Sequence, residues 1–139
     1  YADVLLNLAE ALNEQGKIDE AVTVVNQVRA RAGAQLLNSN VPTTVMGQAD
    51  MRERIRNERY WELLGEDLIY FDELRWKTWK DKKFATYDDN GKQVVNGLRQ
   101  VWGQATYHYA WGGDHYWLYP IPYNETQMNP NMEQNPGWK

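Results

Sequence analysis

The sequence of 139 residues contains no cysteine, so neither a disulfide bond nor a thiolate metal site can form within it. It also has no apolar run approaching the roughly 18 residues that a membrane-spanning helix requires. The chain also has no excess of basic residues. Its formal net charge of -4 argues against a nucleic-acid partner that binds through its phosphate groups. The sequence therefore predicts neither a disulfide-stapled module, nor a membrane span, nor a nucleic-acid-binding protein.

Phenylalanine is scarce too, with two residues, whereas the chain has seven Trp and nine Tyr. Trp and Tyr carry a polar edge on a large apolar ring, and they are common on surfaces that bind something. The length is that of one domain. Because a helical pattern is already under way at Tyr1, we expect residues 1–139 to be a fragment of something longer.

Residues 1–33 have the pattern of a helical hairpin. Apolar side chains recur at helical spacing both before and after Gly16. The small residues Ala9 and Ala21 flank this turn and allow the two helices to approach closely. The pattern predicts a tetratricopeptide-like unit, and it fits any other antiparallel helix pair equally well.

Residues 50–79 predict a long third helix, straight or with a kink at Gly65, in which charged and aromatic side chains alternate on every face. Asp50 and Glu53 have the spacing of a capping box, which predicts where this helix starts. An ordinary amphipathic helix separates an apolar stripe from a polar one. Because this segment does not, some of its charged residues must face protein. We expect four to be partly buried and paired: Arg56, Arg59, Glu62 and Glu66.

Glu58, Glu62 and Glu66 recur every fourth residue on one face of this helix, which invites comparison with the carboxylate pair of a glycoside hydrolase. Arg54 and Arg59 lie close enough to pair with them. Arginine neighbours favour the charged form of a carboxylate, which suits a structural ion pair better than a general acid. We therefore predict that the chain has no catalytic residues and is not an enzyme.

Residues 84–139 predict a loop-rich tail. The turn residues 88–91 separate short strand-like runs and predict a small β-hairpin. They also resemble part of a calcium loop, but the downstream glutamate is missing. Prolines require residues 119–122 to be extended. His108 and His115 lack the spacing of a metal site, and we predict neither a metal ion nor a cofactor.

The ring-dense segment 102–113 is the best candidate for ligand binding. Tryptophan and tyrosine rings can cover the apolar C–H faces of a sugar while its hydroxyls stay in water. Gly112 and Gly113 predict a sharp turn that leaves Trp111 unshielded. The predicted ligand-binding residues are Trp111, Tyr109, Trp102 and Tyr107. Five other rings are assigned to the core: Trp61, Trp76, Tyr116, Trp117 and Tyr119.

Three blocks of the sequence resemble the C-terminal part of the SusD/RagB family, and together they span nearly the whole chain. The blocks are YADVLLNLAEALNEQGKIDEAVTVVNQVRARAG (residues 1–33), IRNERYWELLGEDLIYFDELRW (residues 55–76) and YWLYPIPYNETQMNPNMEQNPGW (residues 116–138). The third is very specific. In the second, a Gly-x-Arg often follows the last glutamate, and this chain has Asp67, Leu68 and Ile69 there instead.

The resemblance implies a mainly α, SusD-like fold that contains tetratricopeptide-like helices and long irregular loops. It also implies that residues 1–139 are the C-terminal portion of a single, larger SusD-like domain. It implies a lipid-anchored protein of the outer membrane and cell surface, with its anchor upstream of Tyr1. Such a protein binds oligosaccharides without cleaving them and acts as a lid on a SusC-like, TonB-dependent transporter. The alternatives are a tetratricopeptide-type protein-interaction scaffold without a sugar site and, third, a glycoside hydrolase.

Overall fold

The computed structural model describes residues 1–87, 93–96, 99–102, 105–108 and 111–138, and between residues 85 and 108 it describes the backbone alone. The chain divides into two compact units, Tyr1–Ile69 and Tyr70–Lys139. Each unit is described below by itself. The expectation that both belong to one larger domain stays a prediction.

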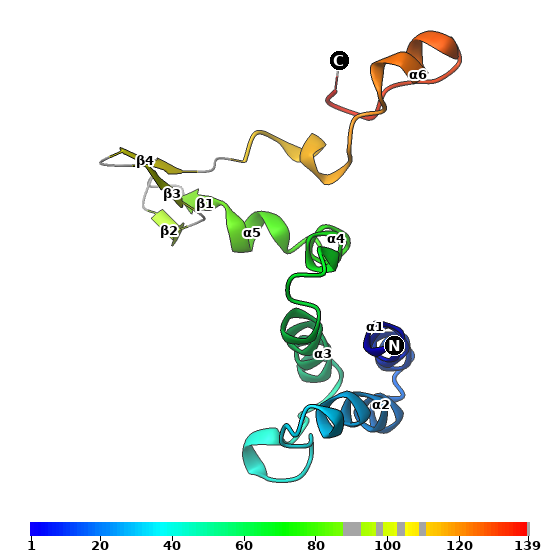
Figure 1. Ribbon diagram of the computed structural model, residues 1–139, viewed down its shortest axis with the longest axis vertical. Helices are drawn as coiled ribbons and strands as arrows, with labels where there is room; N and C mark the ends of the chain where they lie inside the picture. Colours follow the sequence, from blue (N-terminus) through cyan, green and yellow to red (C-terminus); the bar gives the residue numbers. More distant parts are fainter. Residues whose placement is uncertain (88–92, 97–98, 103–104, 109–110, 139) are drawn as a thin grey trace. The chain divides into compact units, whose positions relative to one another are not determined.

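Unit 1 begins with the helical hairpin that the sequence predicts, and this prediction is confirmed. Helix α1 (Ala2–Glu14) and helix α2 (Ile18–Arg31) pack side by side (Figure 1). Gly16 joins them with a φ of +78°, a left-handed conformation that glycine adopts without steric cost. The apolar stripes of both helices are buried against each other: Leu5, Leu6, Ala9, Ala21, Val22, Val24, Val25 and Val28.

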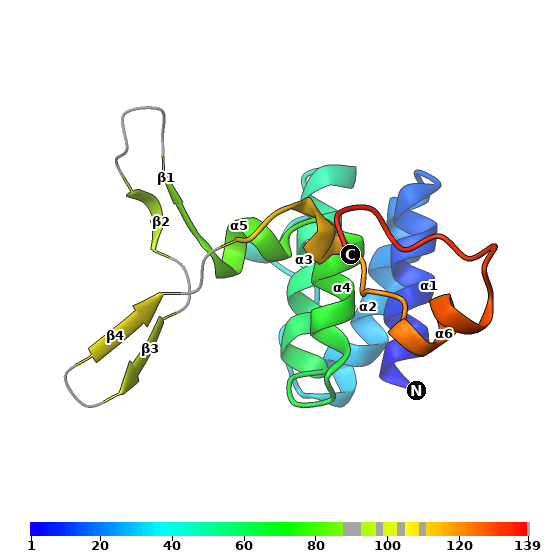
Figure 2. The same ribbon diagram turned by 90° about the horizontal axis from the view of Figure 1, so that it is seen from above.

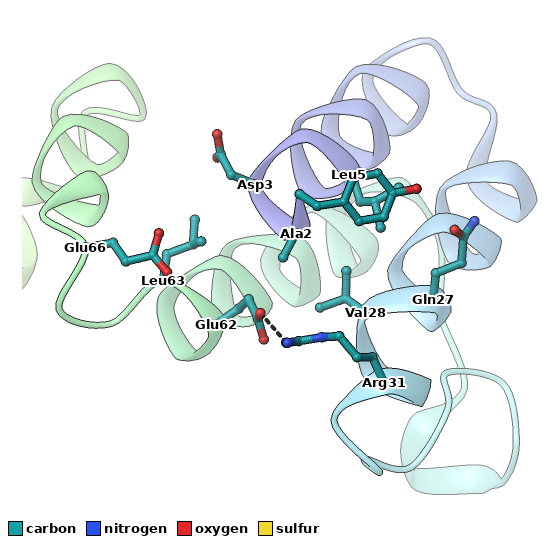
Figure 3. A pocket seen from close by; sticks show the side chains of 10 residues that line it. Ala2, Asp3, Leu5, Gln27, Val28, Arg31, Glu62, Leu63 and Glu66 are labelled. Atoms are coloured by element: carbon teal, nitrogen blue, oxygen red, sulfur yellow. Dashed lines mark hydrogen bonds and ion pairs between the residues drawn. The ribbon is translucent and has the colours of Figure 1, made fainter.

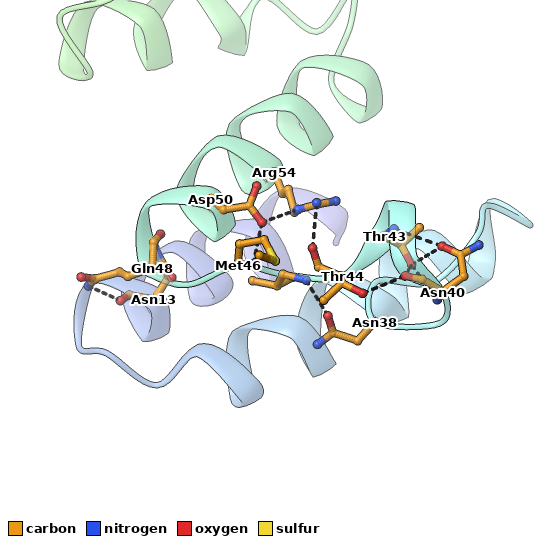
Figure 4. A network of polar contacts seen from close by, with 10 residues as sticks. Asn13, Asn38, Asn40, Thr43, Thr44, Met46, Gln48, Asp50 and Arg54 are labelled. Atoms are coloured by element: carbon orange, nitrogen blue, oxygen red, sulfur yellow. Dashed lines mark hydrogen bonds and ion pairs between the residues drawn. The ribbon is translucent and has the colours of Figure 1, made fainter.

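Helix α3 (Gln48–Glu62) completes the three-helix core of unit 1, where Met51 and Ile55 are fully buried (Figure 1). A loop with a short 3-10 helix, η1 (Val41–Thr43), leads into it. The predicted start at Asp50 is wrong, because α3 begins two residues earlier. The carboxylate of Asp50 instead accepts the backbone N–H of Met46 at 2.9 Å, which lowers the pKa of Asp50, with a further contribution from Arg54 (Figure 4).

A reciprocal pair of amide hydrogen bonds ties the end of α1 to the start of α3 (Figure 4). Asn13 Nδ2 donates to the carbonyl oxygen of Gln48 at 3.1 Å, and Gln48 Nε2 donates to the carbonyl oxygen of Asn13 at 2.6 Å. The side chain of Asn13 is completely buried. A buried amide is costly without hydrogen-bond partners, and this contact supplies one for the amide nitrogen of Asn13.

The long helix predicted over residues 50–79 is wrong. The segment contains three helices: α3, α4 (Leu68–Arg75) and α5 (Trp79–Lys83). Gly65 (φ +88°) and Asp67 (φ +58°) are left-handed between α3 and α4, and Lys77 (φ +58°) is left-handed between α4 and α5. A left-handed residue cannot continue a right-handed helix, so the chain turns at both places.

Buried ion pairs join α3 to both helices of the hairpin. Arg59, which is 3% exposed, donates to Asp3 at 2.9 Å and to Asn7 at 2.8 Å. Glu58, which is 7% exposed, pairs with Arg29 of α2. Helix α3 is therefore held against the hairpin by charged side chains with specific partners as well as by its buried apolar residues.

The predicted pairing of four charged residues is confirmed for three of them. Besides Arg59, Arg56 pairs with Glu53 at 2.8 Å, and Glu62 pairs with Arg31. The prediction is wrong for Glu66, which is exposed. Glu66 follows the left-handed Gly65, beyond the end of α3, so it does not continue the face on which the spacing placed it.

Unit 2 contains two short antiparallel hairpins (Figure 2). Strands β1 (Ala85–Tyr87) and β2 (Gln93–Asn96) pair across the predicted turn, whose residues 88–92 lie outside the described part of the chain, as does the calcium-like pattern there. Strands β3 (Arg99–Trp102) and β4 (Ala105–His108) form the second hairpin. The short helices η2 (Asp114–Trp117) and α6 (Tyr123–Met128) follow.

Replacing Glu58 with alanine is expected to lower the free energy of unfolding by about 3–5 kcal/mol, because Arg29, whose side chain is 15% exposed, loses its carboxylate partner. Glu62→Ala is the matched control, one turn further along the same helix. Its partner Arg31 is 65% exposed, so the expected loss is within about 1 kcal/mol. Urea unfolding of both variants measures the difference, and equal losses would show that burial does not distinguish the two pairs.

Candidate functional site

Unit 1 contains a polar hollow of about 540 Å³ beside the beginning of α1 (Figure 3). The ion pair between Arg31 and Glu62 lies in it, together with the carboxylates of Asp3 and Glu66. Asp3 also accepts from the buried Arg59. The charged groups that line this hollow are therefore largely engaged in holding the helices together.

The glutamates of α3 have the contacts of structural residues. Glu58 and Glu62 each pair with an arginine of α2, and Glu66 is exposed beyond the end of the helix. A general acid needs a carboxyl group held in its neutral form, whereas an arginine partner stabilises the charged form. The geometry thus agrees with the sequence-based assignment of Glu58 and Glu62 to ion pairs, and it does not support that assignment for Glu66.

Trp111 is the centre of an aromatic cluster in unit 2. Its ring centroid lies 4.7 Å from that of Trp117, 5.2 Å from Phe84, 5.5 Å from Tyr116 and 6.1 Å from Trp79. Edge-to-face and tilted contacts at these distances stabilise beyond simple burial. The half-buried Trp111 is therefore the ring on which its four neighbours pack.

The predicted exposure of Trp111 is wrong, and the reason lies in the neighbouring glycine. A Cβ atom on Gly112 would lie only 2.7 Å from the hydroxyl oxygen of Tyr116. Gly112 thus makes room for the ring of Tyr116, which then packs on Trp111. The indole N–H of Trp111 donates to Asp114 at 3.3 Å.

The other three predicted ligand-binding residues are not brought into this cluster by anything the structure describes. Trp102 lies in β3 opposite Ala105 of β4, and Tyr107 pairs with Gln100. Their side chains, and the whole of Tyr109, lie outside the described part of the chain. Their role in ligand binding stays a prediction.

The rings that the sequence assigned to the core divide into two groups. Trp76 and Trp117 are half-buried, as expected of packing residues. Trp61 and Tyr119 are 65% and 62% exposed, so their assignment to the core is wrong; Tyr116 is 39% exposed and packs against Trp111. Spacing along the chain does not show which of several large rings a fold leaves in water.

Beside the cluster lies an apolar hollow of about 290 Å³, which we call the aromatic hollow. Residues from α4, α5, η2 and the tail line it: Tyr70, Trp79, Phe84, Tyr116, Leu118, Tyr119 and Trp138. Rings arranged in this way can cover the C–H face of a sugar. Sequence analysis missed Tyr70, Trp79 and Phe84, because no spacing indicates that their segments converge.

The C-terminal tail fixes the rim of the aromatic hollow. Trp138 Nε1 donates to the carbonyl oxygen of Leu118 at 2.9 Å, and Asn135 Nδ2 donates to that of Tyr119 at 2.6 Å. The side-chain amide of Gln134 makes two hydrogen bonds with the backbone of Ile121. The extended segment 118–122 thus satisfies its backbone groups with side chains of the tail instead of a neighbouring strand.

The environment of Tyr70 in the aromatic hollow shifts the pKa of its phenol. Burial among rings, together with a hydrogen bond to Tyr119, raises the pKa of Tyr70 to about 12. Its ring meets that of Trp79 edge-on at 5.1 Å. Both causes stabilise the neutral phenol, so Tyr70 remains a hydrogen-bonding group, not a base, at neutral pH.

No described part of the chain offers a metal site: no group of three or more histidine, cysteine, aspartate or glutamate side chains there could hold an ion. The side chain of His108 is outside the description, and His115 packs against Trp138 with ring centroids 4.6 Å apart. Among the helices that the structure describes, none has both the length and the apolar character to cross a membrane.

The raised pKa of Tyr70 predicts a loss of stability at high pH. Below about pH 10 the phenol is protonated in both states; above it, the unfolded chain releases the proton first, so the free energy of unfolding falls until about pH 12. Urea unfolding at pH 9 to 12 is expected to show a smaller fall for Tyr70→Phe than for the wild type. Tyr123→Phe, at a 73% exposed ring, is the control, and an identical pH dependence of all three proteins would contradict the assignment.

The chain is similar in sequence to the proteins of a known family. The family model described as the SusD family matches residues 1–138. Two SusD-like proteins of Formosa agariphila are similar to the chain: one is 33% identical over 134 residues (93% of this chain, 21% of the relative), the other 40% identical over 78 residues (54% and 16%).

Solved structures of SusD-like proteins have a similar fold. A SusD-like protein of Bacteroides fragilis superimposes with a TM-score of 0.73 and 26% identity, over 99% of this chain and 25% of that one. The chain thus spans about a fifth of its more extensively matched curated relative. Its mainly α, tetratricopeptide-like architecture is that of SusD-like proteins, which are generally glycan-binding, and the chain belongs to the SusD family.

Proposed function

We propose that this chain is part of a protein that binds oligosaccharides at the cell surface without cleaving them and passes them to a SusC-like, TonB-dependent transporter. Membership of the SusD family supports this role, since its members are generally non-catalytic glycan-binding proteins associated with the outer membrane. The protein would be held at the outer membrane by a lipid anchor that is not part of residues 1–139.

The aromatic hollow is the observation that carries the proposal for this part of the protein. Its walls are rings and its polar groups are few, chiefly the hydroxyls of Tyr70 and Tyr119. A pyranose ring presents this same combination of an apolar face and hydroxyl groups. We assign Tyr119 and Tyr116 the role of platforms and Trp111 the role of the ring that supports them.

The predicted contribution of Trp111, Tyr109, Trp102 and Tyr107 remains part of the proposal. Trp111 acts through Tyr116, whose ring it touches at a centroid distance of 5.5 Å. The other three follow one another along the β3–β4 hairpin and its exit, directly before Trp111 in the sequence. We propose that these three residues contribute to the binding of a glycan longer than one sugar.

A protein-interaction scaffold is the second candidate, and one observation favours it. Tyr1, Val4 and Leu8 form an apolar stripe on α1 and are 90%, 63% and 47% exposed. Such a stripe is typical of a tetratricopeptide-like helix that stacks on a further helical unit. A scaffold of this kind would bind a protein partner and no oligosaccharide.

Replacing Tyr119 with alanine is expected to weaken oligosaccharide binding about tenfold to hundredfold, because a lost ring platform costs roughly 1–3 kcal/mol. Tyr119 is 62% exposed, so the melting temperature should be unchanged. Isothermal titration of the complete natural protein, with the glycan imported by the transporter encoded beside it, measures the effect.

Trp61→Ala is the control for this titration, because Trp61 is equally exposed but lies in unit 1. Equal affinities of the wild type and both variants would remove the aromatic hollow from the binding site. A wild type that binds no glycan but co-purifies with a protein partner would favour the scaffold. Release of shorter products from a reducing-end-labelled oligosaccharide would instead show a glycoside hydrolase.

A further inference from the structure

Helix η2 separates the aromatic hollow from a second, more open hollow of about 550 Å³ in unit 2. Tyr116 lines the first hollow, whereas His115 and Trp117 line the second. We call the second the lysine hollow after its cationic residue. Its lining is Lys77, Asp114, His115, Trp117, Leu118, Pro136 and Gly137.

Lys77 occupies a backbone position that ordinarily belongs to glycine. Its φ is +58°, its N–H donates to the carbonyl oxygen of Leu74 at 3.1 Å, and the N–H of Thr78 donates to that of Glu73 at 3.0 Å. These two hydrogen bonds form a Schellman motif at the end of α4, in which glycine is the usual left-handed residue. A lysine there is strained, and such strain is characteristic of ligand-binding positions.

The ammonium group of Lys77 has no carboxylate partner within the part of the chain that the structure describes. It lies 4.6 Å from the centre of the Trp117 ring. Other lysines of this region have acidic neighbours: Lys80 lies 4.0 Å from Asp114, and Lys83 lies 3.7 Å from Glu73. The charge of Lys77 is therefore available to a ligand in the hollow.

His115, another residue that lines the lysine hollow, is closely surrounded by its neighbours. A Cβ atom on Gly137 would lie 2.7 Å from Cβ of His115, and one on Gly113 would lie 2.9 Å from its Nδ1. The imidazole meets the ring of Trp138 edge-on. Two glycines thus admit this side chain closely, and its polar ring is held at a defined position in the lining of the lysine hollow.

We propose that the lysine hollow binds an acidic sugar residue, one that carries a carboxylate or a sulfate group. The inference rests on the proposed function, because the sugar would belong to the oligosaccharide that the protein takes up. The Lys77 ammonium would pair with the anionic group, Trp117 would contact the sugar ring, and His115 would hydrogen-bond to it. Asp114 is the one acidic residue of the lining, and Lys80 offsets its charge.

The test compares acidic oligosaccharides with neutral counterparts of the same backbone, using the complete natural protein. Oligogalacturonate is paired with its methyl ester, and a dextran sulfate oligomer with dextran, so that carboxylate and sulfate are distinguished. Isothermal titration at two salt concentrations is expected to show tighter, salt-sensitive binding of one acidic probe. If neither acidic probe binds more tightly than its neutral counterpart, the proposal is overturned.

Lys77→Gly is the decisive variant, because it removes the charge and the backbone strain together. The melting temperature is expected to rise, while affinity for the acidic probe falls about tenfold, as for the loss of one charge-assisted hydrogen bond. Affinity for the neutral probe should stay within twofold. Lys77→Arg keeps the charge and should keep the preference.

Two controls separate the charge effect from the strain effect. Lys82→Gln removes an exposed lysine of α5 that does not line the hollow, and it should leave the preference unchanged. Asp67→Gly relieves another left-handed position in unit 1 and should change stability alone. A Lys77→Gly protein that keeps its preference overturns the inference and leaves the proposed function standing, whereas failure of every glycan to bind the wild type removes both.

Discussion

The ion pairs of α3 are the constraint on which the three-helix core of unit 1 depends. Arg59 is more deeply buried than many apolar side chains of the same unit, and it reaches α1 through Asp3 and Asn7. Glu58 reaches α2 through Arg29. Charges taken out of water destabilise a fold unless fixed partners meet them. The relative position of the three helices is therefore specified by directional contacts, and the apolar core around Met51 fills the space between them.

These pairs also show how far sequence reasoning reaches in unit 1. The missing apolar stripe of residues 50–79 predicted that four charged residues face protein. This is right for Arg56, Arg59 and Glu62 and wrong for Glu66, which lies beyond the end of α3. The partners could not be predicted in the same way. Asp3 lies 56 positions from Arg59, and nothing in either segment's spacing points to the other.

The break of the predicted long helix has a different cause. Residues 63–67 contain no proline, and a single glycine is tolerated within many helices, so the sequence pattern continues through the segment. The left-handed conformation of Asp67 and Lys77 costs energy locally and is maintained by the surrounding structure. The helix therefore breaks because of tertiary structure and not because of local sequence. This break produces α4 and α5, which bring Tyr70 and Trp79 into ring contact.

The aromatic hollow shows why ring-rich composition predicts a binding site better than it predicts the residues in that site. A glycine next to a tryptophan can have two opposite structural effects. It can let the backbone turn so that the tryptophan ring is exposed, or it can make room for another ring that covers the tryptophan. The close approach of the Tyr116 side chain to Gly112 shows that the second effect applies here. This approach could not be predicted from the sequence pattern. Trp111 therefore acts through the rings it supports.

The two hollows of unit 2 share a single support. Successive residues of a 3-10 helix point about 120° apart, so η2 presents Tyr116 to one hollow and its neighbours His115 and Trp117 to the other. Trp111 touches both Tyr116 and Trp117. A ligand that fixed either ring would thus restrict the same tryptophan and, through it, the other ring. Binding of a neutral sugar in one hollow and of an acidic sugar in the other would then be coupled through the contacts that the two linings share, which include the direct contact between His115 and Tyr116.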